Sequence, residues 1–287
     1  MMSGFKWLKT HPAVKHKRVK AFGKWIWWQT RQRITSKPYV LDWLDGTRLE
    51  IVPHGGLTGY LYVGLPDYEE LLFLQRALRQ NDLFLDIGAN AGAYSVLAAA
   101  KNCQVHAFEP IPNTYLRLVR NFSLNEGFGK LAAHPKAVGA ERGTLRLTTE
   151  FDTGNRVVAA GMTDPAIEVE TTTLDDVLDQ VAGAGIEHIF AKVDVEGYEL
   201  EVLKGATTFL NSPKVKLLLL ETFRPHNFQT PILREIEERL LKEGFLPFEF
   251  LPERNELRQL TELNDGGNNT LYIRDVDFVM KRLGADV

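Results

Sequence analysis

The chain has 287 residues, of which 44% are hydrophobic and 25% are charged, with a formal net charge of −3, an ordinary balance for a globular protein. A chain of this length can bury a sizeable core and hold one α/β domain with additions. The single cysteine, Cys103, excludes an internal disulfide framework and a cysteine-based zinc site. The sequence has no apolar run of about 18 residues and no apolar signal segment at its start, so we expect a cytoplasmic protein.

The first 38 residues form an arm whose composition differs from that of the remaining chain. Residues 1–37 contain ten Lys or Arg and no Asp or Glu, which leaves 24 basic and 37 acidic residues elsewhere. Four of the five tryptophans also lie in this arm: Trp7, Trp25, Trp27 and Trp28. Basic residues interleaved with aromatic ones are typical of segments that lie on an anionic membrane surface or contact another polyanion. The alternative is a helix that packs its aromatic side chains on the rest of the protein or on a second subunit.

The next segment, residues 39–82, is expected to hold accessory strands and a helix that lead into the core at residues 83–287. Tyr39 to Val52 alternates in places and contains Asp45-Gly46, which favours a β-hairpin. Asp67 to Arg79 has leucines at helical spacing and predicts an amphipathic helix.

The core begins with a short apolar strand, a glycine loop and a helix. Leu83 to Ile87 predict the strand, Gly88-Ala-Asn90-Ala-Gly92 forms the loop, and Ala93 to Ala100 predict the helix. Such a loop at a helix N-terminus lets backbone N–H groups face a small ligand. It lacks the glycine spacing that a dinucleotide pyrophosphate needs, whereas Asp86 before the turn suits a cationic α-amine. The loop therefore favours S-adenosylmethionine over NAD.

A second strand, Gln104 to Phe108, ends in Glu109, which lies 23 positions after Asp86. That spacing is one βαβ step, and an acid at the tip of the second strand can accept hydrogen bonds from both ribose hydroxyls. Such acids also serve NAD, so Glu109 by itself does not identify the cofactor. A third strand is expected from Leu131 to Gly139, where Ala137 and Val138 would flank the adenine.

Strands and helices continue to alternate toward the end of the chain. A helix from Leu174 to Val181 follows Thr173, a typical capping residue, and Pro231 fits the first turn of a helix that ends before Gly244. The other segments with strand or helix patterns are strands at 144–149, 167–172, 189–193, 215–220, 245–250 and 270–274 and a helix at 198–210. This alternation predicts an α/β fold with a doubly wound, mostly parallel sheet.

Four motifs resemble those of FkbM-type methyltransferases and occur in the same order. They are Asp-Ile-Gly-Ala-Asn-Ala-Gly at 86–92, Phe-Glu-Pro at 108–110, Thr-Leu-Asp at 173–175 and Lys-Val-Asp-Val-Glu-Gly-Tyr-Glu at 192–199. The resemblance continues through Glu-Val-Leu-Lys-Gly-Ala at 201–206. It implies a Rossmann-like seven-stranded sheet, bound S-adenosylmethionine and usually methylation of a hydroxyl oxygen on a sugar or polyketide-type metabolite. The basic arm is not part of the family pattern.

Acidic residues after the later strands are the candidates for acceptor chemistry, because ligands of open α/β sheets bind at the carboxyl ends of the strands. Asp194 is our first candidate for the general base and His226 the second, and Glu221 is similarly placed after the fifth strand. The alternatives are support of the donor site or helix capping for Asp194 and a solvated loop position for His226. Asp194, Glu196 and Glu221 could together hold Mg²⁺, which prefers oxygen ligands. Lys192 is expected to pair with Asp194 or Glu221.

The chain is thus expected to be an S-adenosylmethionine-dependent O-methyltransferase with a small-molecule or glycan acceptor, located in the cytoplasm or at the periphery of a membrane. Two other functions stay open: a nicotinamide-dependent oxidoreductase on a similar sheet, and a non-catalytic, membrane-associated binding module of the same fold. The missing third fingerprint glycine disfavours the first, and the intact donor motifs disfavour the second. We expect no nucleic-acid partner and leave homo-oligomerisation open. The acceptor is not named by the sequence, because acceptor pockets are built from variable loops.

Overall fold

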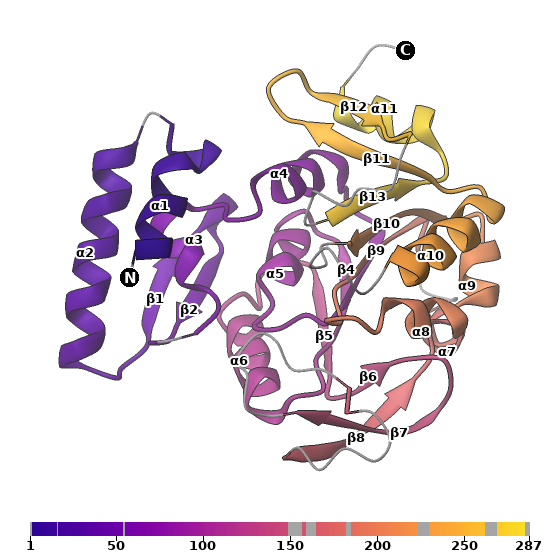
Figure 1. Ribbon diagram of the computed structural model, residues 1–287, viewed down its shortest axis with the longest axis horizontal. Coiled ribbons are helices and arrows are strands. Elements are labelled where there is room, and N and C mark those ends of the chain that lie inside the picture. The colour runs from indigo at the N-terminus through magenta and orange to yellow at the C-terminus, as the bar shows by residue number, and fades with distance from the viewer. Residues whose placement is uncertain are drawn as a thin grey trace.

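An eight-stranded sheet runs through the centre of the protein (Figure 1). This computed structural model describes residues 2–15, 17–53, 55–148, 157–158, 165–181, 185–222, 230–261 and 269–284. The strands follow the order β12-β11-β13-β10-β9-β3-β4-β5. The parallel part consists of β3 (Asp82–Ile87), β4 (Gln104–Phe108), β5 (Lys130–His134), β9 (His188–Val193) and β10 (Val215–Glu221). This order confirms the predicted Rossmann-like, doubly wound architecture.

The sheet continues beyond β10 through antiparallel pairing. β13 (Asn269–Ile273) pairs with β10, β11 (Leu246–Leu251) pairs with β13, and β12 (Glu256–Gln259) pairs with β11 at the edge. Seven strands were expected, and β12 is the eighth. Its sequence, Glu-Leu-Arg-Gln, carries one apolar residue, so the strand has no hydrophobic pattern that would reveal it.

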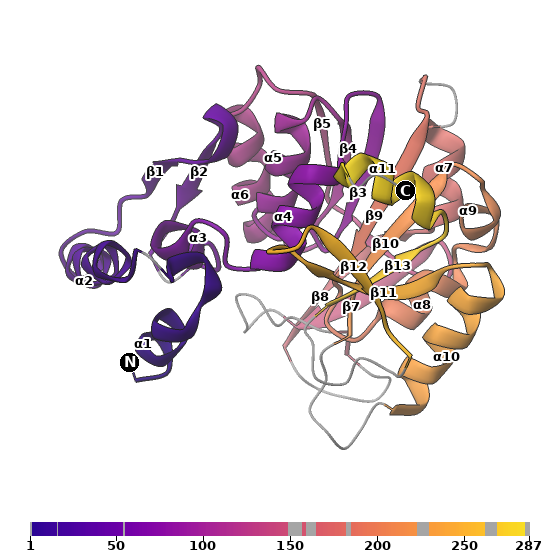
Figure 2. The ribbon, with the colours of Figure 1, turned by 90° about the horizontal axis from the view of Figure 1, so that it is seen from above.

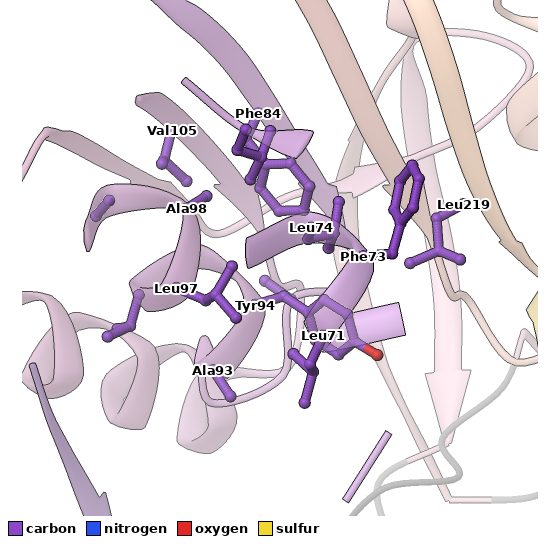
Figure 3. Packing of buried hydrophobic residues seen from close by; sticks show 14 of the residues in the cluster. Leu71, Phe73, Leu74, Phe84, Ala93, Tyr94, Leu97, Ala98, Val105 and Leu219 are labelled. Atoms are coloured by element: carbon purple, nitrogen blue, oxygen red, sulfur yellow. The ribbon is translucent and has the colours of Figure 1, made fainter. Parts of the chain in front are cut away.

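Helices cover both faces of the sheet, because successive strand residues point to opposite faces. On β3, Phe84 packs into one apolar cluster, whereas Leu85 and Ile87 pack into another. The helices whose buried residues join the Phe84 cluster are α4 (Tyr68–Ala77), α5 (Ala93–Ala100), α6 (Pro112–Ser123) and α11 (Val276–Leu283). Those on the opposite face are α7 (Leu174–Val181), α8 (Glu199–Lys204), α9 (Thr207–Asn211) and α10 (Thr230–Lys242). Figure 3 shows leucines of α4 and alanines of α5 around Phe84.

Two elements expected as single pieces are each split. The segment 131–139 breaks into β5 and β6 (Ala137–Val138), since Pro135 has no N–H to continue the ladder. β6 then joins a separate three-stranded sheet with β8 (Ala166–Thr172) and β7 (Gly143–Thr148). The helix at 198–210 breaks between α8 and α9 at Gly205, where a Cβ atom would lie 2.1 Å from the Gly139 carbonyl oxygen. The strand break comes from the missing N–H of Pro135, and the helix break comes from packing against a residue far along the chain. Neither cause changes the local spacing of apolar residues, from which the elements were predicted.

The N-terminal elements gather at one end of the long axis (Figures 1 and 2). They are α1 (Met2–Thr10), the 3₁₀ turns η1 (Pro12–Val14) and η2 (Leu44–Gly46), α2 (Arg18–Ile34), β1 (Tyr39–Asp42), β2 (Arg48–Ile51) and α3 (Thr58–Val63). The predicted hairpin is confirmed, with β1 antiparallel to β2 and positive φ values at Asp45 and Gly46. Side-chain amides of Asn121 and Asn125 fasten β2 to the core: Asn125 accepts from the Arg48 N–H and Asn121 from the Glu50 N–H.

The arm packs on these neighbours through several buried side chains. Trp28 of α2 is fully buried beside Tyr39, and Ala21 joins Leu8 and Val14 in a small apolar cluster. Partly buried Tyr62 of α3 packs against that cluster. Among the described residues, no helix combines the length and apolar character needed to cross a membrane.

Candidate active site

A cavity of about 390 Å³ opens at the carboxyl ends of β3, β4, β9 and β10. This edge of the sheet is where open α/β folds bind ligands. Residues predicted for the site that line the cavity are Gly88, Asn90, Glu109, Ala137, Val138, Asp194, Glu196 and Glu221. His226, the second candidate base, lies outside the described residues. The structure therefore brings most of the predicted donor and acceptor residues to one place.

Three left-handed backbone positions shape the glycine loop. The φ angles are +78° at Gly88, +50° at Asn90 and +84° at Gly92. Glycine adopts such angles without strain, and asparagine tolerates them better than most residues. The Asn90 side chain also accepts a 2.7 Å hydrogen bond from the Ala91 N–H. This alternation explains why the motif reads Gly-x-Asn-x-Gly, whereas the sequence had suggested only a tight turn.

The backbone N–H groups of this loop bond within the protein, which differs from the expectation that they face a ligand. The Gly88 and Ala89 N–H groups both donate to the Phe108 carbonyl oxygen at 3.0 Å. The Asn90 N–H donates to Glu109 at 3.0 Å, and the Gly92 N–H donates to the Ala89 carbonyl oxygen. The loop thus offers a shaped surface to the cavity, and hydrogen-bonding capacity comes from neighbouring side chains.

Glu109 is the acidic side chain at the tip of β4. Its two carboxylate oxygens accept from the backbone N–H groups of Asn90, at 3.0 Å, and Ile111, at 2.9 Å. Burial raises the pKa of Glu109 to about 7, although these two hydrogen bonds act in the opposite direction. Each oxygen has two lone pairs, so the ionised carboxylate can still accept hydrogen bonds from a ligand.

Asp86 lies behind the glycine loop and does not line the cavity. Residue alternation turns it toward α5, where the Ser95 hydroxyl donates to it at 2.6 Å. Burial raises its pKa, and the neighbouring Lys192 ammonium opposes that shift. Gly92 is also outside the cavity lining and stands immediately before α5. Both residues hold the loop in place from behind.

Lys192 and Asp194 form the ion pair that was expected at the tip of β9. Lys192 stands beside Asp86 in the parallel register of β9 and β3. Its ammonium lies 2.7 Å from the Asp194 carboxylate and 4.8 Å from the centre of the Tyr94 ring. Burial lowers the pKa of Lys192, but the attraction of nearby carboxylates outweighs it, so the net shift is upward. The buried lysine is therefore charged and offsets part of the acidity of the site.

The loop after β9 holds a cluster of carboxylates. Single oxygens of Asp194, Glu196 and Glu221 all lie within 4.8 Å of one another. Glu196 has a φ of +53°, an uncommon conformation for a residue with a side chain. Buried Glu199 supports it by accepting from the N–H groups of Val195, at 3.2 Å, and Gly197, at 3.1 Å. These contacts give the spacing of the 192–199 motif a physical reason: Glu199 folds the loop that presents the acids.

The opposite wall comes from residues that sequence reasoning missed. Tyr60 of α3, Asp67 and Tyr94 line the cavity, and the Tyr94 hydroxyl donates to Asp67 at 3.1 Å. Burial raises the pKa of Asp67, and the Tyr94 hydrogen bond opposes that shift. Asp67 directly precedes α4, so its sequence position indicates no more than a capping residue. Apolar residues Leu145, Leu147 and Val157 also line the cavity, together with Ala137 and Val138, which were predicted to flank the adenine.

Part of the chain is similar in sequence to known methyltransferases. The family model described as "Methyltransferase FkbM domain" matches residues 86–247. The chain is 31% identical over 153 residues to hexuronic acid methyltransferase AglP of Haloferax volcanii, covering 49% of this chain and 56% of the relative. It is 30% identical over 193 residues to methyltransferase sdnD of Sordaria araneosa, covering 56% of this chain and 74% of the relative. The chain thus spans little more than half the length of the first relative.

Solved structures give weaker similarities. The S-adenosylmethionine-dependent methyltransferase from Agrobacterium tumefaciens superposes with a TM-score of 0.44 at 12% identity, over 83% of this chain and 70% of that chain. Precorrin-6y C5,15-methyltransferase from Geobacter metallireducens gives a TM-score of 0.38 at 13% identity, over 72% and 86%.

Proposed function

The chain belongs to the FkbM methyltransferase family, and we propose that it transfers the methyl group of S-adenosylmethionine to a hydroxyl oxygen of a sugar, glycan or secondary metabolite. The observation that carries the proposal is one cavity lined by both Glu109, which we assign to the donor, and Asp194, which we assign to the acceptor. When bound, the donor supplies a methyl group already activated on a sulfonium. The protein then has to orient the acceptor, exclude water and receive one proton.

The charge of the cavity supports a cationic donor. Five acidic residues line it: Asp67, Glu109, Asp194, Glu196 and Glu221. Lys192 is the one cationic residue that lines it in the described part of the chain, and it is already paired with Asp194. Such a surface attracts the sulfonium and the α-amine, and it repels the pyrophosphate of NAD. This electrostatic argument disfavours the oxidoreductase alternative independently of the glycine spacing.

Asp194 is the proposed general base. Its side chain stands at the tip of β9 and is partly exposed to the cavity, where an acceptor hydroxyl can reach it. As the acceptor oxygen bonds to the methyl carbon, the carbon–sulfur bond would break with its electron pair left on sulfur, and the hydroxyl proton would pass to the Asp194 carboxylate. Lys192 holds the carboxylate in place by its 2.7 Å contact. Asp67 on the opposite wall is the second described candidate, and His226 remains a candidate from the sequence.

The test is a methyl-transfer assay with donor labelled in the methyl group. Cell extracts are separated into lipid, glycan and small-metabolite fractions, and each is incubated with the wild-type protein or with Asp194→Asn. We expect label in one fraction with the wild type only. Treating the product with mild alkali then distinguishes the bond, because a methyl ether survives and a methyl ester is hydrolysed. Label lost to alkali would contradict hydroxyl methylation and indicate a carboxylate acceptor.

The non-catalytic alternative makes a different prediction. A binding module would retain S-adenosylmethionine affinity in calorimetry and label none of the three fractions. An enzyme should bind the donor and also turn over in at least one fraction. Measuring both properties on the same preparation separates the two functions.

A further inference from the structure

Helix α2 carries two apolar stripes on different sides. The inner stripe contains buried Ala21 and Trp28, which pack on the neighbouring elements. The second stripe consists of Val19, Phe22 and Ile26, at positions i, i+3 and i+7, and is called the outer stripe below. Its residues are 90%, 36% and 46% exposed, respectively. Since residues at this spacing share one helix face, α2 presents a continuous apolar surface to solvent.

The surroundings of the outer stripe are strongly basic. Arg18, Lys20 and Arg33 are exposed on the same helix, and residues 1–37 contain no acidic side chain. Burial lowers the pKa of Lys24, and the like charges of Lys20 and Lys17 lower it further, which is consistent with a concentrated positive potential. The other 250 residues carry a formal balance of −13, so the charge of the molecule is segregated at one end.

The position of α2 leaves the outer stripe accessible. The helix lies at the extreme end of the long axis, beyond β1, β2 and α3 (Figures 1 and 2). Trp28 and Ala21 fix the rotation of the helix about its own axis, because both are buried on the inner side. The outer stripe is therefore held on a different side of the helix, with Phe22 at its edge stacked on partly buried Trp25 at 5.6 Å. Trp27 is also exposed on α2, although its ring lies 5.1 Å from the ring of Tyr39.

We propose that the outer stripe binds the interfacial region of an anionic lipid membrane. Apolar side chains enter the acyl boundary, exposed indoles lie at the headgroup level, and the surrounding Lys and Arg contact lipid phosphates. A second copy of the chain fits less well, because a two-fold contact through this face would bring two arms without acidic residues together. Nucleic acid supplies the negative charge but no apolar phase for Val19 and Ile26.

The experiment is co-sedimentation of the full-length protein with vesicles. One set contains phosphatidylcholine alone, and the other contains equal parts of phosphatidylcholine and phosphatidylglycerol. We expect binding to the anionic set only, with an affinity that falls as salt is raised. Ile26→Glu should weaken this binding by about tenfold or more, since it removes an inserted side chain and adds a repelled charge.

Leu241→Glu is the matched control. Leu241 lies on α10, far from the arm, and is 42% exposed compared with 46% for Ile26. It should bind vesicles like the wild type. Ile26→Lys separates insertion from charge attraction: insertion predicts weaker binding than wild type, and attraction alone predicts stronger binding. Because both positions are exposed, unchanged thermal transitions should confirm that the three variants are folded.

Three results would overturn the proposal. The first is equal binding to neutral and anionic vesicles. The second is an Ile26→Glu protein that binds as tightly as the wild type. The third is a wild-type dimer in sedimentation velocity that Ile26→Glu dissociates while vesicles are not bound, which would assign the stripe to self-association. None of these readouts depends on methyl transfer, so the proposal stands or falls separately from the catalytic function.

Discussion

The Glu109 carboxylate accepts hydrogen bonds from two backbone N–H groups at the same time. Its oxygens anchor the glycine loop through the Asn90 N–H and the β4 exit through the Ile111 N–H. Glu109 also lines the cavity, and its carboxylate has lone pairs left with which we propose that it accepts from two ribose hydroxyls. Sequence reasoning found Glu109 from its spacing but not the loop contact, because a hydrogen bond to Asn90 leaves no pattern in residue types. If Glu109 binds the donor as proposed, the same side chain couples loop geometry to ligand binding.

Donor affinity should depend on pH through Glu109. Its pKa of about 7 means that the carboxylate is ionised above neutrality and protonated below it. The ionised form accepts both ribose hydroxyls, so affinity should be constant above pH 8 and fall at lower pH, by about tenfold at pH 6. Calorimetry with S-adenosylmethionine across this range measures the effect. Glu109→Ala should bind about 1.5–3 kcal/mol more weakly at high pH and show a flat profile; a flat wild-type profile would contradict the assignment.

Asp194→Asn should lower kcat by about 10²–10⁴-fold, since an amide cannot accept the acceptor proton. Donor affinity, measured by calorimetry, should change little. Asp67→Asn is the matched control, because it makes the same change on the opposite wall of the cavity. If Asp67→Asn loses turnover and Asp194→Asn keeps it, the base is Asp67 and Asp194 positions Lys192.

Chelation tests whether the three clustered carboxylates need a metal ion. Lys192 already supplies a buried positive charge 2.7 Å from Asp194, and that charge offsets the repulsion among the acids. We therefore expect methyl transfer to be unchanged by EDTA and by added Mg²⁺. A loss of activity that Mg²⁺ restores would instead assign Asp194, Glu196 and Glu221 as ligands.

At the scale of elements, the donor loop and the tip of β9 are built against each other. A Cβ atom at Gly88 would lie 1.9 Å from the Asp194 carbonyl oxygen, and φ is already +78° there. The strand–loop–helix unit was predictable, because an apolar strand, turn residues and an alanine-rich helix follow each other locally. The contact of this unit with β9 was not predictable, since that contact joins segments separated by about a hundred residues.

Gly88→Ala should therefore separate the loop from β9. Overpacking against backbone typically costs about 1–3 kcal/mol, and the positive φ adds to that cost. We expect a lower thermal midpoint together with loss of measurable donor binding. Gly127→Ala is the control, because a methyl group at Gly127 would have no atom within 4 Å and the φ angle there is not left-handed. Wild-type donor affinity in Gly88→Ala would show that the close contact is relieved elsewhere.

Two adjacent tryptophans of α2 should differ sharply in their effect on stability. Trp28 is fully buried beside Tyr39, whereas Trp27 is exposed. Trp28→Ala should lower the free energy of unfolding by about 3–5 kcal/mol, as large core truncations do, and Trp27→Ala by less than about 1 kcal/mol. Denaturant unfolding of the two variants measures the difference. Equal, small losses would mean that the arm does not pack on the hairpin in solution.

At the scale of the whole molecule, the sequence predicted the parallel core and most of the residues at the strand tips that line the cavity, although Asp86 and Gly92 do not line it. It did so because Rossmann-like sheets bring strand tips together and each tip carried a recognisable residue. It did not predict the second wall of the cavity. Tyr60 and Asp67 lie upstream of the family motifs, and their placement depends on how α3 and α4 pack against Tyr94. A residue whose role comes from tertiary contact alone has no periodicity or spacing that would reveal it.

Helix α3 is shared between the two ends of the molecule. Tyr60 lines the cavity, and Tyr62 and Val63, on the same short helix, pack against the arm. A six-residue helix has little stability of its own, so its position depends on both neighbours. If membrane binding of the arm shifts α3, the affinity of the cavity for its ligand changes by some factor. Because free energy is a state function, ligand binding must then change the membrane affinity of the arm by the same factor. Vesicle binding measured with and without S-adenosylmethionine would give this factor, and by reciprocity it also gives the effect of vesicles on the affinity for S-adenosylmethionine.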